Sequence, residues 1–183
     1  VASKPGSQEI CFVPDGDYRG FVRRRHRHSG SDGPLSSCAC QPGEIVDRAG
    51  RVLGRHSGLI DYTVGQRRGL RIARARPLYV IALDAQRNRV VVGEKGDVFA
   101  RGLVAGEINW VSVAGSQRPF AARVQIRYRH EAAPAMVEPL GEGRVRAVFE
   151  SPQPAVTPGQ AAVFYDTENE RLLGGGWIEK PCD

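Results

Sequence analysis

Leu78-Tyr79-Val80-Ile81-Ala82-Leu83 is a run of apolar and β-branched residues that ends at the polar segment Asp84-Ala85-Gln86-Arg87-Asn88, and Arg89-Val90-Val91-Val92 follows directly. Two such runs on either side of a short polar segment are typical of a β-hairpin, because β-branched side chains pack well on a pleated surface. This stretch therefore favours β structure for the middle of the chain.

The same alternation of strand and turn extends in both directions from this hairpin. Upstream, Ile45-Val46 and Arg51-Val52-Leu53 flank the turn Asp47-Arg48-Ala49-Gly50, which predicts a smaller hairpin. Downstream, we predict strands over residues 107–113, 121–129, 135–140, 144–149, 161–165 and 172–178. Many short strands with turn signals between them indicate a barrel or a sandwich, so the expected fold class is mainly β. We expect a change of domain at Gly102 to Gly106, where glycines interrupt the pattern.

The first forty residues have a different character. Residues 1–13 are polar without periodicity, which predicts an extended segment. Asp15 or Asp17 can cap a short helix that runs through Val22 to Arg25, with its apolar side formed by Tyr18, Phe21 and Val22. The basic run from Arg23 to His28 and the polar residues 29–34 then predict a flexible loop.

The charge of the chain comes almost entirely from arginine. The formal net charge is +6 and the isoelectric point is about 9.5, with 26 Lys and Arg residues of which only Lys4, Lys95 and Lys180 are lysines. Planar guanidinium groups suit phosphate, so this composition favours a polyanionic partner such as nucleic acid. A genome of high G+C content would produce the same arginine bias without any ligand, and composition leaves both explanations open.

The apolar runs and the cysteines of the sequence indicate the cellular compartment of the protein. No apolar run approaches the roughly 20 residues that span a bilayer, and the first residues lack the apolar core of a secretion signal. Cys11, Cys38, Cys40 and Cys182 show no regular spacing, which suits a reducing compartment better than a disulfide framework. We therefore expect a soluble cytoplasmic protein without a membrane partner.

Two arginine-containing patterns are candidate binding sites. In residues 121–129 the side chains alternate, with Ala122, Val124, Ile126 and Tyr128 on one face and Arg123, Gln125, Arg127 and Arg129 on the other. Three guanidinium groups on one strand can neutralise successive phosphates, although a charged exposed face also simply keeps a strand soluble. The second pattern places Arg67 and Arg68 between Gly65 and Gly69, where a tight turn can present both side chains to an anion.

The glycine-rich motifs do not indicate a nucleotide site. The turn around Arg67 and Arg68 lacks the glycine-lysine signature of a Walker loop. The run from Gly174 to Gly176 lacks G-x-G-x-x-G spacing, which indicates a bulge or a close approach of two backbones instead.

The cysteines and histidines have competing interpretations. Cys11 stands in a short polar segment between Ile10 and Phe12, where it is either a sulfur-handling nucleophile or a small buried side chain. The pairs His26-x-His28 and Cys38-x-Cys40 do not have the usual spacing of zinc ligands, so we predict no metal site and keep a zinc-bound loop only as a weak alternative. His56 and His130 have no catalytic partner nearby in the sequence, which favours structural or surface roles.

Taken together, seven segments resemble the tRNA-specific 2-thiouridylase family in the same order along the chain. They are Ser7-Gln8-Glu9-Ile10-Cys11-Phe12, Pro42-Gly43-Glu44-Ile45-Val46-Asp47, Gly54-Arg55-His56-x-Gly58-Leu59, Tyr62-Thr63-x-Gly65-Gln66-Arg67-Arg68-Gly69-Leu70, Arg127-Tyr128-Arg129, Thr157-Pro158-Gly159-Gln160-Ala161 and Leu173-Gly174-Gly175-Gly176-Trp177-Ile178. The resemblance extends over the C-terminal half of that family and lacks its ATP pyrophosphatase domain, with its Ser-Gly-Gly-Val-Asp-Ser type phosphate loop.

The resemblance implies four parts. Residues 1–22 would be the tail of the catalytic domain, residues 23–41 a basic flexible insertion, residues 42–104 a small central β domain, and residues 105–183 a tRNA-binding antiparallel β-barrel. The insertion is longer and more basic than the family pattern, so Cys38 and Cys40, which lie in it, receive no family role.

The resemblance also implies a function, that of a tRNA-uridine 2-sulfurtransferase. ATP and Mg, bound by the N-terminal ATP pyrophosphatase domain, would activate C2 of the wobble uridine, and Cys11 would carry the incoming sulfur as a persulfide. The sulfur donor would be a cysteine desulfurase or a sulfur-relay protein. Arg127, Tyr128 and Gln160 would contact tRNA, and Arg67, Arg68, Arg123 and Arg129 are further candidates for RNA contact.

By this interpretation the chain alone is expected to be inactive and to bind no cofactor. The alternative is a non-catalytic β-barrel module that binds RNA or a protein partner, with Cys11 as a structural thiol.

Overall fold

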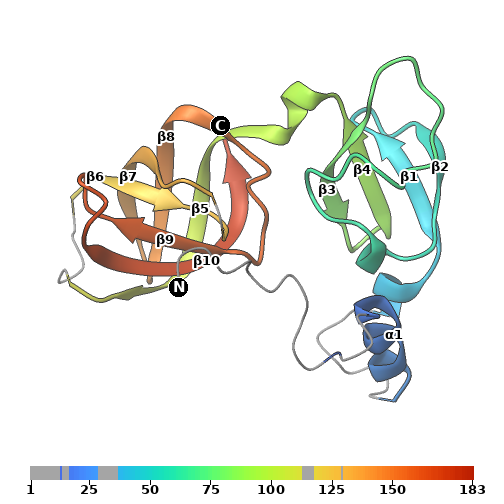
Figure 1. Ribbon diagram of the computed structural model, residues 1–183, viewed down its shortest axis with the longest axis horizontal. Helices are drawn as coiled ribbons and strands as arrows, with labels where there is room; N and C mark the ends of the chain where they lie inside the picture. The colour runs from blue at the N-terminus through green and yellow to red at the C-terminus, as the bar shows by residue number, and fades with distance from the viewer. Residues whose placement is uncertain (1–12, 14–16, 29–36, 113–117, 129) are drawn as a thin grey trace, which may run out of the picture.

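The computed structural model describes residue 13 and residues 17–28, 37–112, 118–128 and 130–183. A helix and a 3₁₀ turn precede two separate β units, as Figure 1 shows. The elements before the second unit are α1 (Tyr18–His28), η1 (Ser37–Cys40), β1 (Gly43–Asp47), β2 (Val52–His56), η2 (Leu59–Asp61), β3 (Tyr79–Asp84), β4 (Arg89–Gly93) and η3 (Lys95–Val98). The second unit contains β5 (Phe99–Trp110), β6 (Phe120–Gln125), β7 (Ala133–Gly141), β8 (Arg144–Pro154), β9 (Ala161–Tyr165) and β10 (Leu172–Cys182).

The first β unit, here called the sheet domain (residues 37–98), is a four-stranded sheet in the order β2-β1-β4-β3. Both hairpins predicted from the sequence are confirmed, since β1 pairs antiparallel with β2 and β3 pairs antiparallel with β4. The two hairpins are joined by a parallel pairing of β1 with β4, in which Ile45 lies opposite Val90. Ile45, Val80, Val90 and Val92 are completely buried, and Leu59 and Leu70 from the connection between β2 and β3 complete the core.

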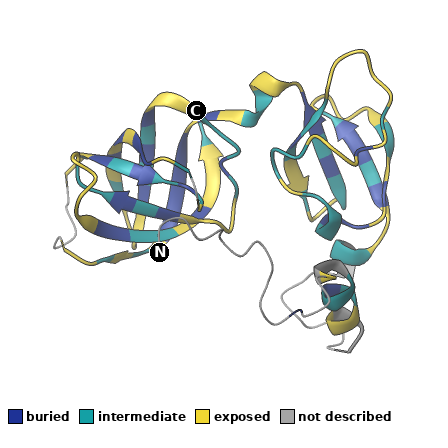
Figure 2. Ribbon diagram, in the orientation of Figure 1, coloured by how far each residue is buried: buried dark blue, intermediate teal, exposed yellow. Residues whose placement is uncertain are grey.

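The second unit is a closed barrel (residues 99–183) in the order β10-β5-β8-β7-β6-β9, and every neighbouring pair is antiparallel. Figure 2 shows the alternation of buried and exposed positions along its strands, which is the pattern of a sheet with one face in the core. Completely buried side chains such as Leu103, Val124, Val137 and Phe164 fill its interior. The mainly β fold class is therefore confirmed.

The expected change of domain at Gly102 to Gly106 instead falls inside β5, and the two β units are joined by η3. These glycines reflect close packing of strands. A Cβ at position 102 would lie 2.5 Å from the carbonyl oxygen of Ala147 on β8, and one at position 106 would collide with the Glu179 side chain on β10. A glycine that lets two strands approach looks the same in the sequence as a glycine at a boundary.

The strand predicted over residues 121–129 ends early, at Gln125. Ala122, Val124 and Ile126 are buried as expected, but Tyr128 is 79% exposed instead of sharing their face. The chain turns after Ile126, and the His130 amide donates to the Arg127 carbonyl over 3.2 Å. Strand alternation therefore does not apply to Arg127 and Tyr128.

Helix α1 begins with the predicted cap at Asp17. The Asp17 carboxylate accepts a hydrogen bond from the Gly20 amide at 2.8 Å, which satisfies one of the free donors of the first turn. The helix then continues through the basic run that the sequence suggested as a loop and ends at His28. Arg23 donates to Asp61 of η2 over 2.7 Å, so the helix is attached to the sheet domain. Among the described residues, no helix has the length and apolar character needed to cross a membrane.

Candidate nucleic-acid interface

The turn after β6 holds two of the predicted contact residues. Tyr128 is strongly exposed at its tip, whereas Arg127 is half-buried and donates from a guanidinium nitrogen to the Pro154 carbonyl at 2.8 Å. On the other side of the turn, the Gln125 side-chain amide donates to the His130 carbonyl at 2.7 Å. These bonds fix both arms of the turn, so the Tyr128 ring is presented from a rigid base.

Gln160 lies in the connection between β8 and β9, and its side chain is exposed. Two backbone hydrogen bonds of 2.8 Å attach this segment to β10: the Gly159 amide donates to the Ile178 carbonyl, and the Ile178 amide donates to the Gln160 carbonyl. Pro154, which accepts the bond from Arg127, is the last residue of β8 and directly precedes this connection. The structure thus brings Arg127 to the start of the segment that carries Gln160.

Arg123 and Arg127 do not form the continuous arginine row expected on one strand. Arg123 is half-buried within β6, opposite Pro134 of β7 and Tyr165 of β9, while Arg127 belongs to the turn beyond the strand. Arg129 lies outside the described residues, as does Cys11, so their predicted roles stay predictions.

The turn with Arg67 and Arg68 is organised by Gln66, whose role the sequence analysis missed. The Gln66 side-chain oxygen accepts a hydrogen bond from the Thr63 amide at 3.0 Å, and its amide nitrogen donates to the Arg68 carbonyl at 2.9 Å. Two backbone bonds with Val80 attach the turn to β3. Both arginines of the turn are exposed. The signal for this role was an amide residue between Gly65 and Gly69, because an amide side chain near turn glycines can bond to the backbone of the turn.

His130 is part of the frame behind Tyr128. A ring nitrogen lies 3.1 Å from the side-chain oxygen of Gln153, and the other ring nitrogen is buried without a partner. Burial lowers the pKa of His130 below its usual value, and the nearby positive charge of Arg127 lowers it further. The neutral imidazole is therefore the favoured form.

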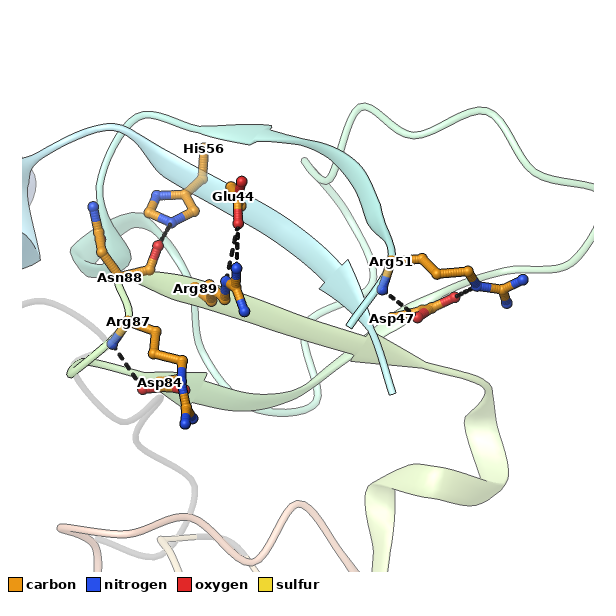
Figure 3. A network of polar contacts seen from close by, with 8 residues as sticks. All are labelled: Glu44, Asp47, Arg51, His56, Asp84, Arg87, Asn88 and Arg89. Carbon is orange, nitrogen blue, oxygen red and sulfur yellow. Dashed lines mark hydrogen bonds and ion pairs between the residues drawn. The ribbon is translucent and has the colours of Figure 1, made fainter. Parts of the chain in front are cut away.

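His56 has the structural role expected for it, with 3% exposure and a contact of 3.1 Å from a ring nitrogen to the Asn88 carbonyl, visible in Figure 3. Cys40 and Cys182 are free, half-buried thiols. Within the described residues no group of three or more His, Cys, Asp and Glu side chains is arranged to hold a metal ion. The side chains of His26, His28 and Cys38 lie outside the described part, so this result does not test the zinc alternative.

Two protein-family models match the two β units separately. The model described as "Aminomethyltransferase beta-barrel domain" matches residues 100–178, and that described as "tRNA methyl transferase PRC-barrel domain" matches residues 36–94. Their limits agree with the barrel and the sheet domain and leave η3 at the junction.

Curated relatives carry both units in the same order. The chain is 49% identical over 178 residues to the tRNA-specific 2-thiouridylase MnmA of Syntrophotalea carbinolica, which covers 97% of the chain and 47% of the relative. It is 44% identical over 179 residues to the protein of that name from Acetivibrio thermocellus (98% and 46%), and 49% identical over 179 residues to that from Geobacter metallireducens (98% and 45%). The chain thus spans slightly less than half the length of these relatives.

Proposed function

The chain belongs to the tRNA-specific 2-thiouridylase family, and we propose that it supplies the sulfur-carrying cysteine and the tRNA-docking surface of such an enzyme. The proposed reaction is transfer of a persulfide sulfur to C2 of the wobble uridine. The tRNA specificity in the relatives' names supports tRNA as the substrate class, and the two matched domain models support the assignment to this part of the enzyme.

In the proposed reaction Cys11 holds the sulfur as a persulfide. The terminal sulfur attacks C2 of the adenylated uridine, and the C–O bond breaks as AMP leaves with the oxygen. The thiolate of a second cysteine then attacks the Cys11 sulfur, so that the S–S bond to the uridine breaks, a disulfide forms between the two cysteines and 2-thiouridine is released. We assign that second cysteine, and the ATP and Mg that activate C2, to the ATP pyrophosphatase domain of the longer enzyme. The sulfur donor would be a cysteine desulfurase or a relay protein.

The observation that carries the docking proposal is the fixed turn of Arg127 and Tyr128 beside the segment of Gln160. An exposed aromatic ring on a rigid base can stack on an unpaired base, and such stacking is a common mode of RNA recognition. A half-buried guanidinium and an exposed amide beside the ring add polar contacts for phosphate and sugar. Arg123 and Arg129 are proposed as further contacts.

The docking proposal is tested by replacing Tyr128. We expect Tyr128→Ala to weaken tRNA binding by about tenfold, because one stacked base contributes about 1–3 kcal/mol. Tyr128→Phe keeps the ring and should bind nearly as well as the wild type. Fluorescence anisotropy with labelled tRNA measures both dissociation constants, and equal affinities for Tyr128→Ala and the wild type would exclude stacking at this position.

The sulfur-carrying proposal is tested by mass spectrometry. Incubation of the full-length enzyme with a cysteine desulfurase and free cysteine should add sulfur to the peptide of Cys11, and Cys11→Ser should abolish tRNA thiolation. Cys40→Ser and Cys182→Ser are the matched controls, since both are free thiols of the same chain. Thiolation that survives in Cys11→Ser would instead support the alternative of a barrel module that only binds RNA or protein.

A further inference from the structure

The positive charge of the chain is concentrated in one of the two β units. Residues 37–98 contain eleven Arg and Lys against six Asp and Glu, whereas residues 99–183 contain nine against ten. The sheet domain therefore carries a formal charge of +5 and the barrel a charge of −1. A polyanion that binds the chain therefore finds more positive charge on the sheet domain than on the barrel.

Within the sheet domain, the carboxylates are already paired with arginines. Figure 3 shows three of these pairs, Glu44 with Arg89 at 2.9 Å, Asp47 with Arg51 at 2.7 Å and Asp84 with Arg87 at 3.1 Å. The other three carboxylates are paired as well, in Asp61 with Arg23, Glu94 with Arg76 and Asp97 with Arg48. All six acidic side chains of this domain are therefore neutralised by specific arginines.

The arginines left over are not scattered. Of the arginines in the sheet domain, those that form no ion pair with any described carboxylate are Arg55, Arg67, Arg68, Arg71 and Arg74, and all five are exposed. They lie on β2 and on the connection between η2 and β3, whose tip is the green loop at the upper right of Figure 1. We call these five residues the arginine surface. A genome-wide arginine bias does not explain why four of these five arginines lie on one connection.

The arginine surface borders an open cavity of about 510 Å³ formed by residues 67–78. Arg67, Arg71, Arg74 and Arg76 line it, and no acidic residue does. Arg71 also lines an adjoining cavity of about 490 Å³ together with Arg55 and Gln66. The two cavities share Gly69 and Arg71 in their linings. Asp61 also lines the second cavity, and its carboxylate is paired with Arg23 at 2.7 Å.

The backbone of this loop is fixed before any ligand binds. Leu70 is buried at 6% exposure, and Ile72 and Leu78 pack against the core of the sheet domain. Arg71, between Leu70 and Ile72, is exposed and adopts a left-handed conformation with φ of 53°, which is unfavourable for a residue other than glycine. Binding therefore need not order the loop.

We propose that the arginine surface binds the phosphate backbone of the RNA substrate and provides the main electrostatic part of its affinity. The proposal rests on the RNA substrate proposed above and assigns the two β units different tasks. The sheet domain binds the backbone through charge, and the turn of Tyr128 on the barrel supplies the aromatic contact.

The test compares two double variants that lose the same charge. Arg71→Gln with Arg74→Gln removes two members of the arginine surface, and Arg101→Gln with Lys180→Gln removes two exposed cations of the barrel. The dissociation constant for tRNA is measured between about 50 and about 200 mM salt. Because each phosphate contact contributes about 0.7–0.9 to the slope of log K against log salt, the first variant should lose about 1.5 from the slope and bind about tenfold more weakly. The barrel variant should keep the wild-type slope.

The outcomes separate this inference from the proposed function. A wild-type chain that binds no tRNA would overturn both. A wild-type chain that binds tRNA, with the same slope in Arg71→Gln/Arg74→Gln as in the barrel variant, would overturn only the arginine surface as an RNA site, and an acidic protein would then be the partner to test. Thermal unfolding of both variants checks that the fold is intact, since exposed substitutions change the stability by only about 0.5 kcal/mol.

Discussion

At the scale of single residues, His130 makes the stability of the barrel depend on pH. One ring nitrogen contacts Gln153, and the other is buried without a hydrogen-bond partner, close to the charge of Arg127. Protonation would place an N–H⁺ group where none of the described residues accepts a hydrogen bond from it. The lowered pKa of His130 follows from this geometry, and it makes the folded barrel bind a proton less readily than the unfolded chain does.

We predict that acidification destabilises the barrel through His130. The folded pKa lies below the usual value of 6.5, so the stabilisation from neutral His130 is complete above about pH 6.5 and is lost as the pH falls toward the folded pKa. The urea midpoint should fall less between about pH 7.5 and about pH 5 in His130→Gln than in the wild type. Carboxylates titrate alike in both proteins and cancel from this comparison, and an equal fall in both would exclude His130 as the cause.

At the scale of elements, the run from Gly174 to Gly176 lets β10 lie close to both of its neighbours. The pairing of β10 with β5 shifts register between Gly175 and Trp177, as expected for a bulge. A Cβ at position 176 would lie 2.5 Å from the Gly106 carbonyl oxygen and would also collide with the Ile108 side chain. The predicted close approach of two backbones is therefore confirmed.

We predict that Gly176→Ala destabilises the barrel by about 1–3 kcal/mol, because the backbone of β5 must move to accept the methyl group. Gly96→Ala is the matched control, since a Cβ at position 96 in η3 meets nothing within 4 Å. Chemical denaturation followed by tryptophan fluorescence measures the difference, because Trp110 and Trp177 both lie in the barrel. Equal stability of the two variants would show that β5 adjusts without cost.

A secondary-structure element could be predicted from the sequence where a local sequence signal is sufficient to determine it. Both hairpins were predictable because the apolar run and the turn that ends it are adjacent. The parallel pairing of β1 with β4 was not, since it joins segments separated by a long connection and has no local signal. The end of β6 was missed because Tyr128 continues the alternation in sequence while the chain has already turned.

The types of residue in the candidate site could be predicted from the sequence, but the ion-pair partners of its arginines could not. The sequence indicated exposed arginines at positions 67 and 68, and the structure exposes both. It did not indicate that Arg76 is paired with Glu94 while Arg71 and Arg74 form no ion pair with a described carboxylate. Which arginine neutralises which carboxylate depends on the packing of distant strands, and composition cannot reveal it.

At the scale of the whole molecule, the chain has two separate hydrophobic cores. The units are joined at η3, where the Ala155 amide of the barrel donates to the Val98 carbonyl, and within the sheet domain an ion pair of 2.5 Å between Arg48 and Asp97 holds η3 in place. A cavity of about 450 Å³, lined by residues of both units, also lies between them. An incompletely packed junction transmits little cooperativity from one core to the other.

We predict that the chain unfolds in two thermal transitions. Val90→Ala, in the core of the sheet domain, and Val137→Ala, in the core of the barrel, each remove a completely buried side chain and should cost about 1–3 kcal/mol. Each should lower one transition in differential scanning calorimetry by about 5 °C or more and leave the other in place. A single transition that both substitutions shift equally would contradict the independence of the two cores.

The pairing of β10 with both β5 and β9 has a consequence for the synthesis of the protein. All four strands of the sheet domain precede β5 in the sequence, so a ribosome completes that domain before it begins the barrel. The barrel, in contrast, closes only when its last strand emerges. Until then, β5 and β9 in the nascent chain lack the strand that will lie between them. Their unpaired edges are the places where the growing chain most readily forms wrong strand pairs and where chaperones bind.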